Sequence, residues 1–214
     1  MRRMTSALAG LVALGILAGC AASTKLTHVW TEPTFQANSL QKLMVIGIAQ
    51  KVSARRTFEN AFVAALQKQG IQAVASYSAV GEGQLDSAQV VASLVQNGCD
   101  GAFVTRLVDK KTVETYYPPT TTYVAPVSYG YGGWYGYYST GYAYQSSPGY
   151  TVENQVINLE TNLYRISDAK LVWSALSQSW LDQATDPMSE IAPFVQQLVY
   201  SLESSKVVTK SKKK

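Results

Sequence analysis

Hydrophobic and polar positions follow two periods in the first half of the chain. Leu43-Met44-Val45-Ile46-Gly47-Ile48 is a continuous apolar run ended by polar residues, which is typical of a strand buried on both faces. After it, helical spacing alternates with short apolar runs. This order predicts a strand–helix–strand–helix–strand unit with a parallel sheet, over residues 43–48, 55–69, 71–76, 86–96 and 102–108.

The same spacing assigns an inward and an outward face to each predicted helix. In the first helix Phe58, Phe62 and Leu66 face inward. Arg55 and Glu59 form an i, i+4 pair that we expect on the solvent-exposed side. The inward positions of the second helix are Val90, Val91, Leu94 and Val95.

The second half of the chain has a β pattern followed by one helix. Two long β-like runs, 151–166 and 171–181, flank the turn sequence Ser167-Asp168-Ala169-Lys170 and predict an antiparallel hairpin in the same sheet. A final helix must begin close to Pro193. Its apolar face holds Met188, Ile191, Val195, Leu198 and Leu202. The predicted fold class is therefore mixed α/β: a βαβαβ sheet, extended by the hairpin, closed by a C-terminal helix and carrying a long insertion.

That insertion, residues 115–152, is rich in Tyr and Gly. It holds eleven of the fourteen tyrosines and Trp134, and it contains no charged residue. Three interpretations are open: a flexible low-complexity loop, a binding arm, and a membrane-interface or self-association element. As a binding arm, its expected contacts with a partner are Tyr131, Trp134, Tyr135 and Tyr137.

The N-terminus has the pattern of a secretory signal. Arg2 and Arg3 precede an apolar stretch, residues 7–18, that is too short to span a bilayer. The sequence then reads Leu17-Ala18-Gly19-Cys20, which resembles the lipobox of bacterial lipoproteins. The resemblance implies cleavage between Gly19 and Cys20 and lipidation of Cys20, so that the membrane is a partner through this residue. Ala21 resembles the sorting residue of lipoproteins sent to the outer membrane of Gram-negative bacteria, with the domain facing the periplasm.

These segments divide the chain into four parts. Residues 1–19 are the signal peptide, and 20–41 are a lipidated N-terminus and tether in which Trp30 suggests local docking onto the domain. Residues 42–206 form a single α/β domain that includes the insertion 115–152, and 207–214 are a basic disordered tail. Loss of Arg2 and Arg3 lowers the formal charge from +4 to +2, and four lysines lie in the tail, so the folded part carries no basic face for nucleic acid.

Little in the sequence supports catalysis. The single histidine, His28, lies in the expected tether, and Cys99 is the one thiol left after lipidation, so we expect no metal site, no cofactor and no enzyme. Ser167-Asp168-Ala169-Lys170 matches Ser-x-x-Lys but has the pattern of a turn. Carboxylates that could form a catalytic pair are not fixed together by any pattern: Glu153, Glu160, Asp182 and Asp186.

Several motifs, taken together, resemble a family of uncharacterised bacterial lipoproteins over residues 29–206. The motifs are Val29-Trp30-Thr31-Glu32-Pro33, Lys42-Leu43-Met44-Val45-Ile46-Gly47, Arg55-Arg56-Thr57-Phe58-Glu59, Leu159-Glu160-Thr161-Asn162-Leu163-Tyr164 and Lys170-Leu171-Val172-Trp173-Ser174. More distantly, the element order is similar to the TolB amino-terminal domain and the curli-secretion lipoprotein CsgG. The family carries no assigned activity, whereas the TolB and CsgG likeness implies binding to other envelope proteins. From the aromatic insertion we expect an adaptor that binds an envelope protein or cell-wall partner, or else a self-assembling structural or secretion-pore protein, a homo-oligomer.

Overall fold

A six-stranded sheet with the strand order β1-β8-β7-β4-β2-β3 forms the centre of the computed structural model, which describes residues 23–208 apart from 38, 83–85 and 125–142. A separate two-stranded sheet pairs β5 with β6. The strands are β1 (Ser23–Thr31), β2 (Lys42–Ile48), β3 (Gln72–Ala75), β4 (Gly101–Tyr117), β5 (Thr120–Val124), β6 (Ala143–Ser147), β7 (Tyr150–Arg165) and β8 (Lys170–Asp182).

The predicted fold class is confirmed. β3, β2 and β4 are parallel neighbours, and β7 and β8 form the antiparallel hairpin beside β4. The helices are α1 (Val52–Lys68), α2 (Ser76–Val80), α3 (Ser87–Gln96) and α5 (Ile191–Ser204). Pro193 lies in the first turn of α5, where a missing N–H costs no intrahelical bond. Within the described residues no helix is both long enough and apolar enough to cross a membrane.

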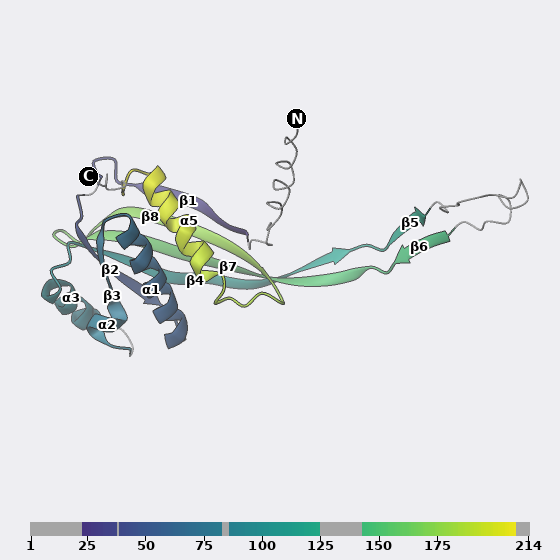
Figure 1. The fold of residues 1–214 in the computed structure, drawn as a ribbon, viewed down its shortest axis with the longest axis horizontal. Coiled ribbons are helices and arrows are strands. Elements are labelled where there is room, and N and C mark those ends of the chain that lie inside the picture. The colour runs from purple at the N-terminus through teal and green to yellow at the C-terminus, as the bar shows by residue number, and fades with distance from the viewer. Residues whose placement is uncertain (1–22, 38, 83–85, 125–142, 209–214) are drawn as a thin grey trace, which may run out of the picture.

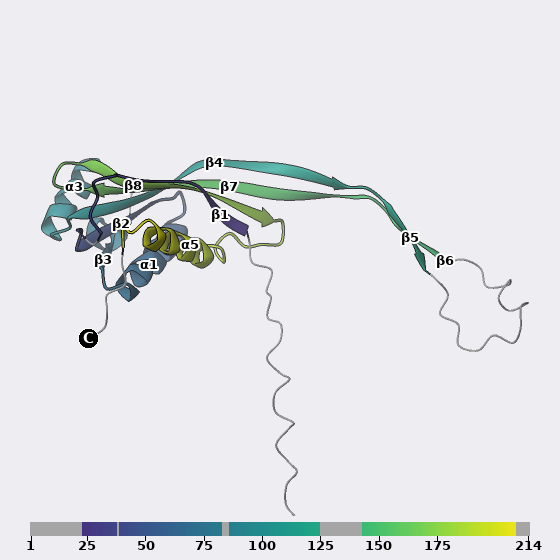
Figure 2. The ribbon, with the colours of Figure 1, turned by 90° about the horizontal axis from the view of Figure 1, so that it is seen from above.

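The main core lies between the sheet and the helices α1 and α5, which cover one face (Figure 2). Phe103 of β4 stands at its centre, with its ring centroid 4.8 Å from that of Phe62 in α1 and 6.2 Å from that of Trp173 in β8. Leu198 of α5 completes this layer. On the opposite face α3 covers a smaller cluster over β2 and β4 through Leu94.

The exposed face of α3 differs from the prediction. Leu94 is buried and Val90 is partly buried, but Val91 and Val95 are exposed to solvent. The correction has a geometric reason: α3 lies over the end of the sheet formed by β2, β3 and β4, so only a narrow stripe of the helix meets other side chains.

Residues 23–31 are not a tether. They form β1, the edge strand of the sheet, which pairs antiparallel with β8 from Ser23 opposite Trp180 to Thr31 opposite Trp173. The domain therefore begins before Lys42. It also ends later than predicted, since Val207 and Val208 are buried in the main core. His28 is exposed within β1 rather than in a linker.

The turn between β7 and β8 is held by an ion pair. The guanidinium of Arg165 donates two hydrogen bonds to the carboxylate of Asp168, of 2.9 and 2.8 Å. Glu32, just after β1, lies 3.6 Å from the same guanidinium. The hydrogen bonds from Arg165 lower the pKa of Asp168 from its usual value to about 2. The predicted turn is confirmed.

An acid titration tests this ion pair. Because the folded-state pKa of Asp168 is depressed, its contribution to stability is fully present above the usual carboxyl pKa and is lost as the pH falls through about 2. Asp168→Asn should therefore flatten the acid dependence of the unfolding free energy in this window and leave its slope near neutral pH unchanged. Urea unfolding at a series of pH values measures this. Equal acid slopes for both proteins would contradict the assignment.

Candidate binding site: the hairpin arm

β4 and β7 continue past the rest of the sheet as a two-stranded arm. β2 pairs with β4 only as far as Arg106, and β8 pairs with β7 only from Asn154 inward. Among the described strands, none lies as a third strand beside residues 114–124 and 143–153, called the hairpin arm here. The arm runs away from the domain in both views (Figures 1 and 2). At about 3.3 Å per residue it reaches about 35 Å to Val124.

A continuous backbone ladder joins the two strands at the base of the arm. After a bulge at Val108, the ladder runs without interruption from Asp109 opposite Asn158 to Tyr117 opposite Tyr150. The β4 side chains in this range are mostly exposed, whereas those of β7 are mostly half-buried and Val156 is fully buried. The Thr, Val and Tyr residues among them favour extended backbone. The insertion predicted from composition is therefore, in its described part, a continuation of the central strands.

Prolines interrupt both strands of the arm at the same position along its length. Pro118 and Pro119 separate β4 from β5, and Pro148 and Gly149 separate β6 from β7. Proline has no N–H to donate to a ladder, so the pairing breaks into two sheets at this joint. A Cβ on Gly149 would lie 2.7 Å from the hydroxyl of Tyr116 and 2.9 Å from Cδ of Pro119, so these side chains leave little room for a side chain at position 149. The arm bends here (Figure 2).

Three tyrosines surround the joint. Tyr116, Tyr117 and Tyr150 are between 45% and 64% exposed. The rings of Tyr117 and Tyr150 stack with their centroids 5.1 Å apart and their planes at 18°. By the alternation of side chains along β4, Tyr116 lies on the other face of the ladder. This joint patch presents flat apolar rings and phenolic hydroxyls to solvent, a surface suited to peptide or glycan contact.

Charge changes sharply at the base of the arm. Glu114 and Glu153 are paired directly across the ladder, and Glu153 accepts a 2.9 Å hydrogen bond from the side-chain amide of Gln183. No charged residue occurs in residues 115–152. Ring contacts and neutral hydrogen bonds, not ion pairs, are the interactions that the arm offers beyond Glu114.

The predicted contact residues and the joint patch are different parts of one insertion. Tyr131, Trp134, Tyr135 and Tyr137 lie outside the described residues, so their role stays a prediction. The patch of Tyr116, Tyr117 and Tyr150 was not among the predicted contacts. Its signal in the sequence is Tyr-Tyr-Pro-Pro near the start of the insertion and Pro-Gly-Tyr near its end, which oppose each other once the strands pair.

A second cluster of functional groups lies at the carboxyl ends of β2 and β3, the place where α/β sheets often bind ligands. Here Arg55 and Glu59 of α1 are paired, as predicted, but they are buried, with 4% and 0% of their side chains exposed. The prediction of a solvent-exposed pair is wrong. Both residues lie on the same helical stripe as Phe58 and Phe62, and that stripe faces the sheet.

Every oxygen of the buried Glu59 carboxylate is occupied. Oε1 accepts hydrogen bonds from Nε of Arg55 (3.0 Å), from the backbone N–H of Gly47 (2.9 Å) and from the hydroxyl of Ser76 (2.7 Å). Oε2 accepts one from the backbone N–H of Tyr77 (2.9 Å). Arg55 also donates to Ser76. The cluster ties α1 to the ends of β2 and β3, so we assign it to the fold rather than to a ligand.

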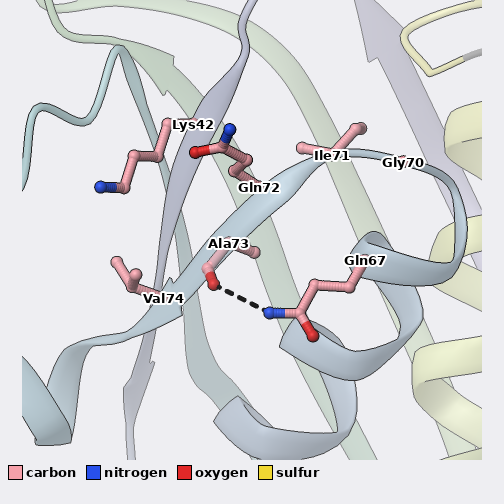
Figure 3. A pocket seen from close by; sticks show the side chains of 7 residues that line it. All are labelled: Lys42, Gln67, Gly70, Ile71, Gln72, Ala73 and Val74. Carbon is pink, nitrogen blue, oxygen red and sulfur yellow. Dashed lines mark hydrogen bonds between the residues drawn. The ribbon is translucent and has the colours of Figure 1, made fainter.

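A depression of about 430 Å³ lies beside the edge strand β3 (Figure 3). The side chain of Gln67 reaches from α1 to donate a 3.3 Å hydrogen bond to the carbonyl of Ala73. The next outward carbonyl, that of Ala75, accepts a 2.7 Å bond from the hydroxyl of Ser78. Because the N–H of Gln72 points inward to Gln41, residues 73 and 75 present their polar groups at the edge. Side chains therefore cap this edge against an added strand.

The residues considered for catalysis are dispersed. Cys99 is buried, and burial raises the pKa of its thiol. Glu160 is paired with Arg106 at 2.7 Å, whereas Asp182 bonds to Thr185 in a local turn. In the part of the chain that the structure describes, no three His, Cys, Asp or Glu side chains gather as a metal site would need.

No family model and no curated protein matches the sequence. Solved structures do resemble the fold. The PelC dodecamer from Paraburkholderia phytofirmans is 11% identical, with a TM-score of 0.47 over 88% of this chain and 100% of that one. Lipoprotein GNA1162 from Neisseria meningitidis is 10% identical, with a TM-score of 0.43 over 77% and 99%. A minor lipoprotein from Acinetobacter baumannii is 11% identical, with a TM-score of 0.30 over 80% and 98%. The resemblance to the TolB and CsgG domains stays a prediction.

Proposed function

We propose that this chain is a lipid-anchored, non-catalytic protein of the bacterial cell envelope that binds another envelope component through its hairpin arm. The arm itself carries the proposal. It extends about 35 Å beyond the sheet, it presents exposed tyrosines on both faces at the joint, and it is neutral beyond Glu114 and Glu153. A solitary two-stranded ladder gains little stability from its own side chains. A partner that covers the aromatic rings would add the apolar burial that the arm itself lacks.

The anchor rests on the sequence Leu17-Ala18-Gly19-Cys20, and the outer membrane, with the domain facing the periplasm, follows from Ala21. One lipid chain holds a protein only marginally, whereas two or more hold it stably, so a multiply acylated Cys20 would keep the domain at the membrane surface. Metabolic labelling with palmitate tests this half of the proposal. Cys20→Ala should abolish the label, and an unchanged label would contradict it.

Self-assembly, as in a structural or secretion-pore protein, is the second candidate. It is favoured by the free edge of β1, a nine-residue strand with exposed Val29 and Trp30. Two features weigh against edge-to-edge pairing of copies. The opposite edge, β3, is short and capped by Gln67 and Ser78, and β1 itself carries a bulge between Leu26 and His28.

Removal of the arm tests the proposal directly. In the arm-less variant, residues 114–153 are replaced by Asn-Gly, which forms a tight hairpin turn, removes the joint tyrosines and leaves the pairing of Val113 with Asn154 intact. After chemical cross-linking in living cells, the full-length protein should give one discrete heavier adduct that the arm-less variant lacks. Both proteins should remain in the membrane fraction. The same adduct from both would place the contact on the domain, and a ladder of self-adducts from both would favour assembly.

A further inference from the structure

The outer face of β8 and β1 is the part of the sheet that the helices leave open. Trp173, Ala175, Ser177 and Ser179 of β8 are buried toward the core, so the alternate residues, which include Leu176 and Trp180, point to the opposite face. The register of β1 places Trp30 beside Ser174, His28 beside Leu176 and Lys25 beside Gln178 on that face.

No described helix lies over this open face. α1 and α5 cover the other side of the sheet, and α3 packs over β2 and β4 at the far end (Figure 2). Trp180 is 41% exposed and Trp30 is 47% exposed. The indole N–H of Trp180 donates to the side-chain carbonyl of Gln178, so its polar edge is held at the surface. The two indoles are separated by six residues of β8, or about 20 Å.

The chain leading to this face is very short. Ser23, the first residue of β1, pairs with Trp180, and it follows the proposed lipid-bearing Cys20 by only three positions. Three residues span at most about 11 Å. A bilayer that holds the acyl chains of Cys20 must therefore lie within about this distance of the strand end beside Trp180.

We propose that the open face of β1 and β8 rests on the lipid bilayer, with Trp180 and Trp30 at the level of the headgroups. The inference rests on the proposed lipidation of Cys20. Tryptophan is enriched at this depth because its ring is apolar and its N–H finds polar partners. Lys25 lies between the indoles and faces anionic headgroups. In this orientation the arm bends at its joint toward the side of α1 and α5, away from the bilayer (Figure 2).

Quenching by brominated lipid tests this orientation. The full chain, carrying Trp134→Phe to remove the indole of the insertion, is purified from bacterial cells that express it and reconstituted into vesicles of phosphatidylethanolamine and phosphatidylglycerol with brominated phosphatidylcholine. Its tryptophan emission should be quenched relative to vesicles without bromine. Adding Trp180→Phe should remove most of the quenching, and adding Trp30→Phe should remove a smaller part. Trp173 is fully buried and serves as the unquenched internal reference.

Flotation of the same vesicles distinguishes failure of the open-face proposal from failure of the lipid anchor. Protein that floats with the vesicles and is not quenched would overturn the open-face proposal while leaving the anchor intact. If the floating, unquenched protein also cross-links to itself through residues introduced at Trp180, a second copy covers the face instead. Protein that does not float would overturn the lipidation of Cys20, and the orientation would fall with it.

Discussion

Glu59→Gln is expected to lower the free energy of unfolding by about 3–5 kcal/mol, the usual cost of removing one partner from a buried ion pair. The carboxylate accepts hydrogen bonds from four different residues, and an amide nitrogen in its place would face a donor in at least one of them. The substitution would also leave the buried guanidinium of Arg55 without the negative charge beside it. Urea unfolding followed by circular dichroism measures the loss.

A matched control exists on the surface of the same domain. Arg106 and Glu160 form an ion pair at 2.7 Å, but the Arg106 side chain is mostly exposed. Exposed pairs contribute little, so Glu160→Gln should cost less than about 1 kcal/mol. A loss of the same size in Glu59→Gln and Glu160→Gln would mean that the Arg55–Glu59 cluster is solvated, and the assignment of this cluster to the fold would be wrong.

Phe103→Ala is expected to lower the free energy of unfolding by about 3–5 kcal/mol, because it removes a fully buried ring from the centre of the core. Phe103 joins the aromatic ring of Phe62 in α1 to that of Trp173 in β8, so its loss weakens the contact of the helix layer with the sheet. Since β4 runs from this core into the arm, the same loss would loosen the base from which the arm projects.

Leu107, four residues further along β4, is the control for Phe103. Its side chain is exposed, and Leu107→Ala should change the unfolding free energy by no more than about 0.5 kcal/mol. Thermal unfolding of both variants measures the contrast. Comparable losses at the two positions would contradict the placement of the core boundary between them.

The core strands and the final helix could be predicted from the sequence because burial imposes a period on their side chains. The edge strand of the sheet could not be predicted in this way. β1 has the sequence Ser-Thr-Lys-Leu-Thr-His-Val-Trp-Thr, whose polar residues resemble a linker, and it is a strand only because β8 offers a free edge. The outer half of β4 is similar, since Asp109 and the residues after it are held by backbone pairing with β7 and not by burial.

The buried cluster could have been recognised from the sequence. One stripe of α1 holds the buried residues Arg55, Phe58, Glu59, Phe62 and Leu66. The helical spacing that predicts burial of the apolar residues therefore also places the charged pair on the buried face. What the sequence does not state is that Gly47, Ser76 and Tyr77 supply the donors. Gly47 lies near the end of β2 whereas Ser76 and Tyr77 begin α2, and only the fold brings them beside Glu59.

The joint of the arm depends on the same kind of long-range pairing. Composition indicates an aromatic insertion but not where its strands pair. The prolines after Tyr117 and before Tyr150 oppose each other only because the β4–β7 register aligns them. Partner contacts in the middle of the insertion and partner contacts at the joint are therefore separate hypotheses about one arm.

The most direct measurement of the central claim is site-specific photo-cross-linking in living cells, with the probe in place of Tyr150 in the full-length chain. The matched control carries the probe at Lys68, an exposed residue at the end of α1 on the domain. The account predicts one discrete heavier adduct from Tyr150 and none from Lys68. Adducts of equal strength at both sites, a ladder of self-adducts, or no adduct from Tyr150 would contradict the arm as the surface that binds another envelope component.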